Sequence, residues 1–377
     1  MKKILRFIIA PILVLALFGF TLTNAGEKTS IAFKKQFTKV EIETVLQDSL
    51  LNIRAIELVK GLDGIAFLTS RGEFGAIGPK DAFEAVRSVG LDQSENYDIV
   101  FPIALKYDSI TPNFRALSAN KKHGYGISIG SPALIYKLNI DEEKIKIVYK
   151  EEHPKAFYDS MEFWNDDEGI AIGDPTEDCM SIIITRDGGN TWSKLSCDDL
   201  PKAKEGEAAF AASDTNIAIV GDQTWVATGG KSSRILYSAD KGKTWSVFET
   251  PIVQGLETTG MYSVDFYDEN HGFAIGGDYT KPADSSANKV RTKDGGKTWE
   301  LVAENQSPGY RSCVKYVPNG AGKKLVAIGF KGIDYSGDSG DSWTHLSDEG
   351  FYTIRFLNDS IAYAAGRGRI SKLTFKE

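Results

Sequence analysis

An eight-residue pattern that occurs four times in the second half of the chain constrains its fold more than any other feature. Each copy fits Ser/Thr-x-Asp-x-Gly-x-Ser/Thr-Trp, and successive copies begin 53, 54 and 44 residues apart. The Asp of such a turn accepts hydrogen bonds from its own backbone, the Gly allows a positive φ, and the Trp covers the hairpin. A repeat of this period indicates one supersecondary unit used several times. The structural residues of the four turns are Asp187, Trp192, Asp240, Trp245, Asp294, Trp299, Asp338 and Trp343.

The segments between these turns have the pattern of paired strands. An apolar run, a polar break and a second apolar run ending in Gly recur, most clearly over residues 160–174 and 263–277. Period-two alternation in short runs bounded by turn residues is typical of strands. Each unit supplies four strands, which is the composition of a propeller blade. We therefore predict an all-β fold, a seven-bladed β-propeller of four-stranded antiparallel blades, with six or eight blades as the alternatives.

The two ends of the chain are predicted to meet in this propeller. The last unit is too short for four strands, so residues 33–46 are expected to supply its outer strand and close the ring without an open edge. Residues 81–111 are expected to form an insertion in the first blade, with a short helix over residues 82–89. The propeller is expected to be a single domain over residues 26–377. Its inner strands are predicted to start near Ile53, Phe114, Tyr158, Gly206, Met261, Tyr310 and Phe351.

The N-terminal residues 1–25 have the anatomy of a secretory signal peptide. Two lysines precede an apolar run from Ile8 to Phe20, and small and polar residues lead to a cleavage site after Ala25. The run is short for a membrane span and Pro11 interrupts it, although an uncleaved anchor is the alternative. We expect an exported protein, periplasmic or extracellular, that is monomeric and has no stable membrane span after cleavage.

Two of the three cysteines are placed for a disulfide bond. Cys179 and Cys197 lie nine residues on either side of Gly188, at the tip of the first Asp turn. In a regular hairpin the two sulfurs would face each other across neighbouring strands, within disulfide reach. We predict this bridge, with two separate thiols as the alternative. Cys313 lies in an apolar run and is expected to be a buried free thiol.

Charge and motif content exclude several classes of function. The formal net charge of −7 argues against nucleic acid as a partner. The four histidines lack the spacing of metal ligands, so no metal is expected. The sequence has no dinucleotide-binding fingerprint, haem-attachment pair or Cys-x-x-Cys motif, so no cofactor is expected either.

The four Asp turns resemble the Asp-box, or BNR, repeats of sialidases and other secreted propellers. The longer context, over about residues 110–377, is similar to bacterial relatives of the plant photosystem II stability/assembly factor. This resemblance implies a seven-bladed propeller with a non-catalytic binding or assembly role. Members of that group are often labelled oxidoreductases, a label for which this sequence has no motif. The segments that carry the resemblance are residues 206–213, 226–230, 276–279 and 309–312.

A candidate ligand site follows from the alignment of the seven inner-strand starts. The alignment places one large polar or aromatic residue of each blade at the mouth of the central channel, and the loops between second and third strands reach the same face. Loop residues that converge on one concavity over a rigid scaffold predict a binding site. The alternative is a solvated rim whose charges pair laterally. The candidates are Arg54, Arg115, Asp159, Glu207, Tyr262, Arg311 and Tyr352 from the strands, with Asp174, Asp222, Trp225, Asp278 and Tyr279 from the loops.

Three functions are compatible with this site. In the leading hypothesis it docks a peptide, a protein or an anionic ligand, with arginines against anionic groups and tyrosines as stacking surface; no catalytic residue is then assigned. The alternative is a sialidase-like glycoside hydrolase that binds a glycan at the same mouth and uses a Tyr–Glu nucleophile pair with an Asp acid/base. The missing Arg-Ile-Pro signature and the predicted seven blades, against six in sialidases, argue against it. The third is a purely structural repeat protein.

Overall fold

Antiparallel strands make up nearly all of the computed structural model, which describes residues 36–59, 61–80, 91–93, 97–139 and 144–377. Residues 36–377 belong to one compact unit. The predicted signal peptide and the helix predicted over residues 82–89 lie outside the described residues. In the described part the only helical segment is the short 3-10 helix η2 (Cys197–Asp199), and no helix there is long and apolar enough to cross a membrane.

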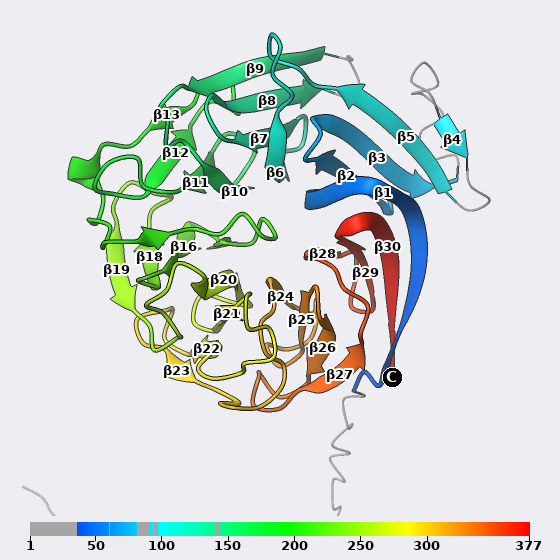
Figure 1. Cartoon of the computed structure of the whole chain (residues 1–377), viewed down its shortest axis with the longest axis vertical. Coiled ribbons are helices and arrows are strands. Elements are labelled where there is room, and N and C mark those ends of the chain that lie inside the picture. The colour runs from blue at the N-terminus through cyan, green and yellow to red at the C-terminus, as the bar shows by residue number, and fades with distance from the viewer. Residues whose placement is uncertain (1–35, 60, 81–90, 94–96, 140–143) are drawn as a thin grey trace, which may run out of the picture. The chain divides into compact units, whose positions relative to one another are not determined.

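The strands form successive sheets that surround a common centre (Figure 1). Four of the sheets in the described ranges have four antiparallel strands each. The first contains β6 (Asn113–Ala119), β7 (Gly124–Ile129), β8 (Ala133–Asn139) and β9 (Lys144–Glu151). The second contains β10 (Tyr158–Phe163), β11 (Gly169–Gly173), β12 (Ser181–Thr185) and β13 (Ser193–Lys194). The third contains β15 (Ile217–Val220), β16 (Gln223–Ala227), β18 (Arg234–Ser238) and β19 (Ser246–Glu249), and the fourth contains β24 (Cys313–Tyr316), β25 (Leu325–Gly329), β26 (Gly332–Ser336) and β27 (Thr344–Ser347).

One long strand near the N-terminus, β1, pairs both with the strand that follows it and with the last strand of the chain. Its first part, Lys39 to Gln47, pairs with β30, and its second part, Ile53 to Val59, pairs with β2. The outer-strand role predicted for residues 33–46 is therefore observed from Lys39 onward. The resulting eight-stranded sheet has the order β28 (Thr353–Phe356), β29 (Ile361–Ala365), β30 (Arg367–Lys376), β1 (Lys39–Val59), β2 (Gly64–Thr69), β3 (Glu73–Pro79), β5 (Tyr97–Ala104) and β4 (Leu91–Gln93).

The last sheet combines four consecutive strands with a two-residue ribbon that precedes them in sequence. Gly229 pairs with Gly260, and this single pairing attaches β14 and β17 to β20. The close approach needs residues without side chains, because a Cβ on Gly260 would lie 2.6 Å from the Gly229 Cα. The order is β14 (Glu207–Ala208), β17 (Gly229–Gly230), β20 (Thr259–Phe266), β21 (Gly272–Asp278), β22 (Lys289–Thr292) and β23 (Glu300–Leu301).

The region predicted as an insertion in the first blade contains a regular strand. Residues 97–104 form β5, which pairs with β3 on one side and β4 on the other. No strand was predicted in this region, because Pro102 lies in the run and Pro within a run argues against a strand. In the structure the β3–β5 register shifts between Val100 and Ile103, so Pro102 lies at a bulge where a ladder N–H is dispensable.

The four Asp turns are held by one recurring set of hydrogen bonds. In the second turn, Asp240 accepts from the Thr244 amide at 2.9 Å and from the Thr244 hydroxyl at 2.7 Å. The Ser238 hydroxyl donates to the same carboxylate and accepts from the Gly242 amide. In the turns at residues 187, 294 and 338, the corresponding Thr or Ser hydroxyl likewise donates a hydrogen bond to the Asp carboxylate. The polar groups of each turn therefore bond mainly to one another, so the turns stabilise the scaffold and have few unpaired donors or acceptors for a ligand.

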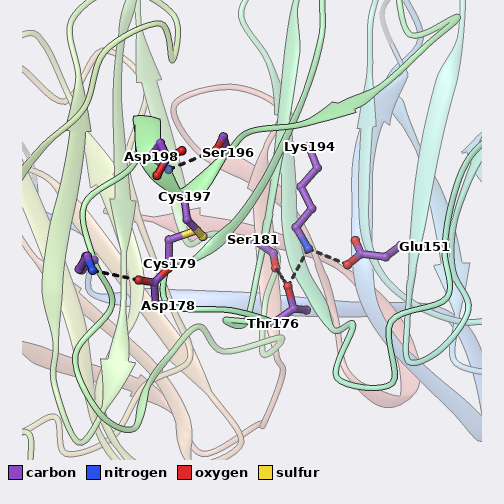
Figure 2. Close-up of a disulfide and its surroundings, with 10 residues drawn as sticks. Glu151, Thr176, Asp178, Cys179, Ser181, Lys194, Ser196, Cys197 and Asp198 are labelled. Carbon is purple, nitrogen blue, oxygen red and sulfur yellow. Dashed lines mark hydrogen bonds and ion pairs between the residues drawn. A yellow bond between two sulfur atoms is a disulfide. The ribbon is translucent and has the colours of Figure 1, made fainter.

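Cys179 and Cys197 form a disulfide bond with their Cα atoms 5.4 Å apart (Figure 2). The cysteines lie beyond the regular ladder of the β12–β13 hairpin, whose last pair is Ile183 with Lys194. Cys197 begins η2, and Cys179 forms an isolated bridge with Lys202. The bond thus joins the segment after the hairpin to the connection that precedes β12, and not two paired strands as the symmetric spacing implied. Cys313 is buried and unbridged.

Candidate functional site

The connection from β14 to β15 passes through the centre of the fold, where Figure 1 shows a green segment between the surrounding sheets. We call residues 209–215 the central plug. The plug exchanges hydrogen bonds with inner strands on several sides, which fix it in place. Its partners include Leu117 on β6, Met161 on β10, Ser312 next to β24 and Thr353 on β28.

A cavity of about 450 Å³ lies on one side of the plug, at the end where the inner strands begin. We call it the mouth pocket. Residues 208–212 of the β14–plug segment line it, so the pocket has a floor made of the chain itself. Seven of the predicted site residues line it: Arg54, Arg115, Asp159, Asp174, Tyr262, Tyr279 and Tyr352. The remaining lining residues are Phe157, Glu257, Tyr310 and Phe330.

Two arginines on adjacent inner strands form the basic side of the mouth pocket. Arg54 donates to the Ala212 carbonyl at 2.9 Å, and Arg115 donates to the Ala211 carbonyl at 3.2 Å. The Arg54 guanidinium also lies 3.9 Å from the centre of the Tyr352 ring. Burial and the neighbouring Arg54 lower the pKa of Arg115 to about 10. Among the described residues, no carboxylate lies within ion-pair distance of either group, and the hydrogen-bond acceptors of both are neutral. The nearby Asp159 interacts with Arg115 electrostatically without a hydrogen bond.

Two carboxyl groups form the acidic side. Asp159 is completely buried, and neither of its oxygens has a hydrogen-bond partner of good geometry. Burial, and secondly the nearby Asp174, raise the pKa of Asp159 well above its usual range. Asp174 accepts a hydrogen bond from the Ala209 amide at 2.8 Å. Burial raises the pKa of Asp174 to about 6, so this group changes charge close to neutral pH.

Aromatic rings form the rest of the wall. Tyr262 stacks on Phe210 of the plug with ring centroids 3.9 Å apart, and the edge of Tyr310 meets Tyr262 at 4.8 Å. Tyr279 and Phe330 continue this cluster outwards and are 47% and 39% exposed. Exposed aromatic side chains around a concavity are typical of binding surfaces, because they offer apolar area with little conformational freedom to lose.

Replacing Asp174 by asparagine is expected to raise the free energy of unfolding by about 2 kcal/mol at pH 7.5 and to leave it unchanged at pH 4. The raised pKa means that protonation of Asp174 stabilises the native state at pH 4, and that this contribution is lost as the pH rises through 6. Asparagine remains neutral and keeps an oxygen for the Ala209 amide. Urea denaturation at the two pH values measures the difference. Equal effects at both pH values would contradict the raised pKa.

Glu207 does not lie at the mouth. The fourth inner strand is β15 (Ile217–Val220), so the alignment of Gly206 as a strand start was wrong. Glu207 is buried in β14, where it accepts hydrogen bonds from Arg234 at 3.0 and 2.5 Å and from the Thr228 hydroxyl at 2.7 Å. The small residues after Glu207 imitate an inner strand, but they form the approach to the plug.

Arg311 is also displaced from the mouth. Pairing with the neighbouring strand makes Ser312, not Arg311, the equivalent of Tyr262. The inner strands β1, β6, β10 and β20 contain a register shift at this level, and β24 does not. A shift of one residue turns a side chain to the opposite face of a strand. Arg311 therefore points away from the mouth, and its Nε donates to Asp334 at 2.6 Å.

Three predicted loop residues lie elsewhere as well. Asp222 is in the β15–β16 turn, where its carbonyl accepts from the Lys241 amide of the Asp turn, so it belongs to the opposite face. Trp225 is completely buried in β16. Asp278 ends β21 and accepts hydrogen bonds from the Thr280 amide and hydroxyl, an Asx turn that shapes the loop.

Four aromatic residues of the pocket were not among the candidates: Phe157, Phe210, Tyr310 and Phe330. Phe157 and Tyr310 come two residues and one residue before the aligned column, respectively, so their position just ahead of the inner strands was a usable signal. Phe210 was hidden by the wrong strand assignment, and Phe330 lies in a tight turn without a pattern. In the described ranges, no group of three His, Cys, Asp or Glu side chains is arranged to hold a metal ion.

No protein-family model matches the chain, and no curated protein sequence matches it either. Solved structures do match. The structure of YCF48 bound to D1 peptide has a TM-score of 0.61 at 13% identity, over 89% of this chain and 96% of that one. YCF48 from Cyanidioschyzon merolae has a TM-score of 0.57 at 12% identity, over 89% and 98%. The RRP9 WD40 repeats have a TM-score of 0.59 at 10% identity, over 91% and 99%. At these identities the likeness concerns the fold: the chain is a β-propeller similar to YCF48 and to WD40 domains.

Proposed function

We propose that the protein is a non-enzymatic binding module that docks a segment of another protein in the mouth pocket. The observation that carries this proposal is the Arg54–Arg115 pair, which forms no ion pair with a described carboxylate and lines the same pocket as the exposed rings of Tyr279 and Phe330. A carboxylate of the partner would supply the missing charge, since arginine binds carboxylates in a planar, bidentate manner. An apolar side chain of the partner, next to this carboxylate, would pack on the aromatic rings around Tyr262. The D1 peptide on YCF48 supports the proposal, because it gives an example of peptide binding on this fold.

In the hydrolase alternative the nucleophile pair consists of Tyr262 and Glu207, yet Glu207 is engaged with Arg234 outside the mouth pocket. The Tyr262 hydroxyl donates to the Thr258 carbonyl at 2.9 Å and its ring is stacked on Phe210. These contacts favour binding over hydrolysis at the same mouth.

We further propose that the array has seven blades and is closed by β1. The proposal is supported by contacts between successive inner strands, in the order β1, β6, β10, β15, β20, β24, β28 and again β1. We also propose that the protein is exported and monomeric, with residues 1–25 removed. The disulfide bond supports export, because such bonds persist mainly outside the reducing cytosol.

Replacing Arg54 and Arg115 together by alanine is expected to lower the affinity for acidic peptides at least tenfold, because both uncompensated charges are removed. The probe is an array of random dodecapeptides, on which the wild-type protein should select peptides that combine a carboxylate with an aromatic or aliphatic residue. Thermal unfolding should change little, since each arginine contributes only one bond of about 1 kcal/mol to a plug carbonyl.

The matched control is Arg186→Ala. Arg186 also donates to a carbonyl of a neighbouring sheet, that of Lys241, but it lies on the face of the Asp turns. The control should select the same peptides as the wild-type protein. If the double variant and the wild-type protein select the same peptides with the same affinity, the mouth pocket is not the docking site.

A further inference from the structure

A second cavity, of about 630 Å³, lies next to the mouth pocket. We call it the lateral cavity. It shares a wall with the mouth pocket, because Tyr310 and Phe330 line the mouth pocket while the next residues, Arg311 and Lys331, line the lateral cavity. A segment bound over one cavity would therefore extend directly over the other. The other lining residues are Lys281, Pro282, Ala283, Asp284, Ser285, Ser307, Gly309 and His345.

Two buried cations, Arg311 and Lys289, lie beside the lateral cavity, and a single buried carboxylate, that of Asp334, is near both. Arg311 is 4% exposed and donates to Asp334, which is itself buried. Lys289 is 1% exposed, and its ammonium donates only to neutral acceptors, namely the Asn288 side chain and the carbonyls of Gln306 and Pro308. Burial lowers the pKa of Lys289 to about 8. The base of the cavity therefore carries an excess of positive charge that no described carboxylate neutralises.

The rim of the lateral cavity adds two exposed lysines, of which Lys281 lies near the carboxylates of Asp278 and Asp284. Lys281 and Lys331 are exposed and line the cavity. His345 lies between the carboxylates of Asp334 and Asp348, at 3.0 and 3.1 Å. Asp284 is the only acidic residue in the described lining. Flexible lysine side chains over an uncompensated buried charge favour anionic groups, in particular carboxylates.

We propose that the lateral cavity is a second subsite of the docking face and binds acidic side chains of the same partner segment whose apolar residue occupies the mouth pocket. The partner is then a segment in which an aromatic residue is followed by aspartates or glutamates. This inference rests on the proposed function, since the mouth pocket sets where the segment begins. It requires further acidic residues in the partner segment, beyond the one carboxylate that the mouth pocket would bind.

The test compares two capped peptides, Ac-Trp-Glu-Asp-Glu-NH2 and its neutral counterpart Ac-Trp-Gln-Asn-Gln-NH2, by isothermal titration calorimetry at low salt. The acidic peptide is expected to bind at least tenfold more tightly. Lys281→Glu combined with Lys331→Glu should abolish this preference. The control, Lys243→Glu with Lys297→Glu, makes the same change of charge at two exposed lysines of the Asp-turn face and should retain it. Thermal unfolding of each variant checks that it is folded.

The outcomes separate the two proposals. If Lys281→Glu with Lys331→Glu leaves the preference for the acidic peptide unchanged and Arg54→Ala with Arg115→Ala removes it, the lateral subsite is refuted while the mouth pocket stands. If the preference depends on Lys281 and Lys331 but the mouth variant changes neither affinity, the mouth pocket is refuted instead. If neither peptide binds with a millimolar or lower dissociation constant, both are refuted. If inorganic phosphate binds the wild-type protein more tightly than the acidic peptide and displaces it, a free oxyanion is the ligand and the lateral subsite for a protein segment is refuted.

Discussion

Replacing Asp214 by alanine is expected to lower the free energy of unfolding by about 3–5 kcal/mol. The Asp214 side chain is buried at the centre of the plug and accepts hydrogen bonds from the Leu117 and Met161 amides and the Ser160 hydroxyl. It also lies 3.7 Å from the Arg355 guanidinium. Alanine would leave these donors without an acceptor at a site that water does not reach. Urea denaturation followed by tryptophan fluorescence measures the loss.

The matched variant for this position is Asp214→Asn. The backbone of Asp214 has φ of +57°, a conformation that Asp and Asn adopt more readily than alanine. Asparagine keeps the size, this backbone tolerance and one acceptor oxygen, so we expect a smaller loss of about 1–3 kcal/mol. If both variants unfold at the wild-type urea concentration, the plug does not hold the inner strands together and the floor of the mouth pocket needs another explanation.

Glu207→Gln is expected to lower the free energy of unfolding by about 3 kcal/mol, since it leaves the buried Arg234 charge without its carboxylate. The side chains of Arg234 and Glu207 are 6% and 0% exposed, and two hydrogen bonds join them. Glutamine keeps the shape of the side chain and an acceptor for the Thr228 hydroxyl, but its NH2 group replaces the oxygen that accepts from Arg234 and from the Lys204 amide. Peptide binding at the mouth pocket should be retained in the fraction that is folded, because Glu207 lies outside that pocket.

A second variant separates charge from packing at this pair. Glu207→Gln combined with Arg234→Met removes both charges, and replacement of a whole buried ion pair is often nearly neutral. We expect the double variant to recover at least half of the stability that Glu207→Gln loses. If the double variant is less stable than Glu207→Gln alone, the hydrogen bonds of Arg234 to backbone, such as that to the Lys202 carbonyl, are the main contribution of this residue.

The repeat pattern was sufficient to predict the class of fold. The Asp turns and the alternation of residues 160–174 and 263–277 are local signals, and strands formed there. The pairing of the N-terminal strand with the end of the chain also followed from a simple count of strands. What the pattern did not reveal was the plug, because Ala208 and Ala209 have the same small side chains as a true strand start. Only the ladder of β15 with β16 distinguishes the two.

The sequence alignment placed a residue at the mouth pocket correctly where its inner strand keeps the register of the neighbouring inner strands. Arg54, Arg115, Asp159, Tyr262 and Tyr352 reach the mouth pocket because four of the five precede the same shifted pair in their ladders and Tyr352 lies at the same level. Arg311 does not, since the pairing of its strand makes Ser312 the residue at the level of Tyr352. The presence of one extra backbone residue is decided by tertiary pairing and leaves no mark in the composition of the strand. The lateral cavity owes its charge to this displacement, so the error in register concealed a second basic site.

The continuous path of β1 through two sheets has a consequence for biosynthesis. Lys39 pairs with Lys376, so the N-terminal part of β1 is synthesised long before β30, the strand with which it pairs. Pairing across such a separation is slow, and an uncovered edge in a nascent chain is prone to associate with other chains. Shortening the C-terminus by the length of β30 should therefore leave a product that accumulates as aggregates rather than as a smaller propeller.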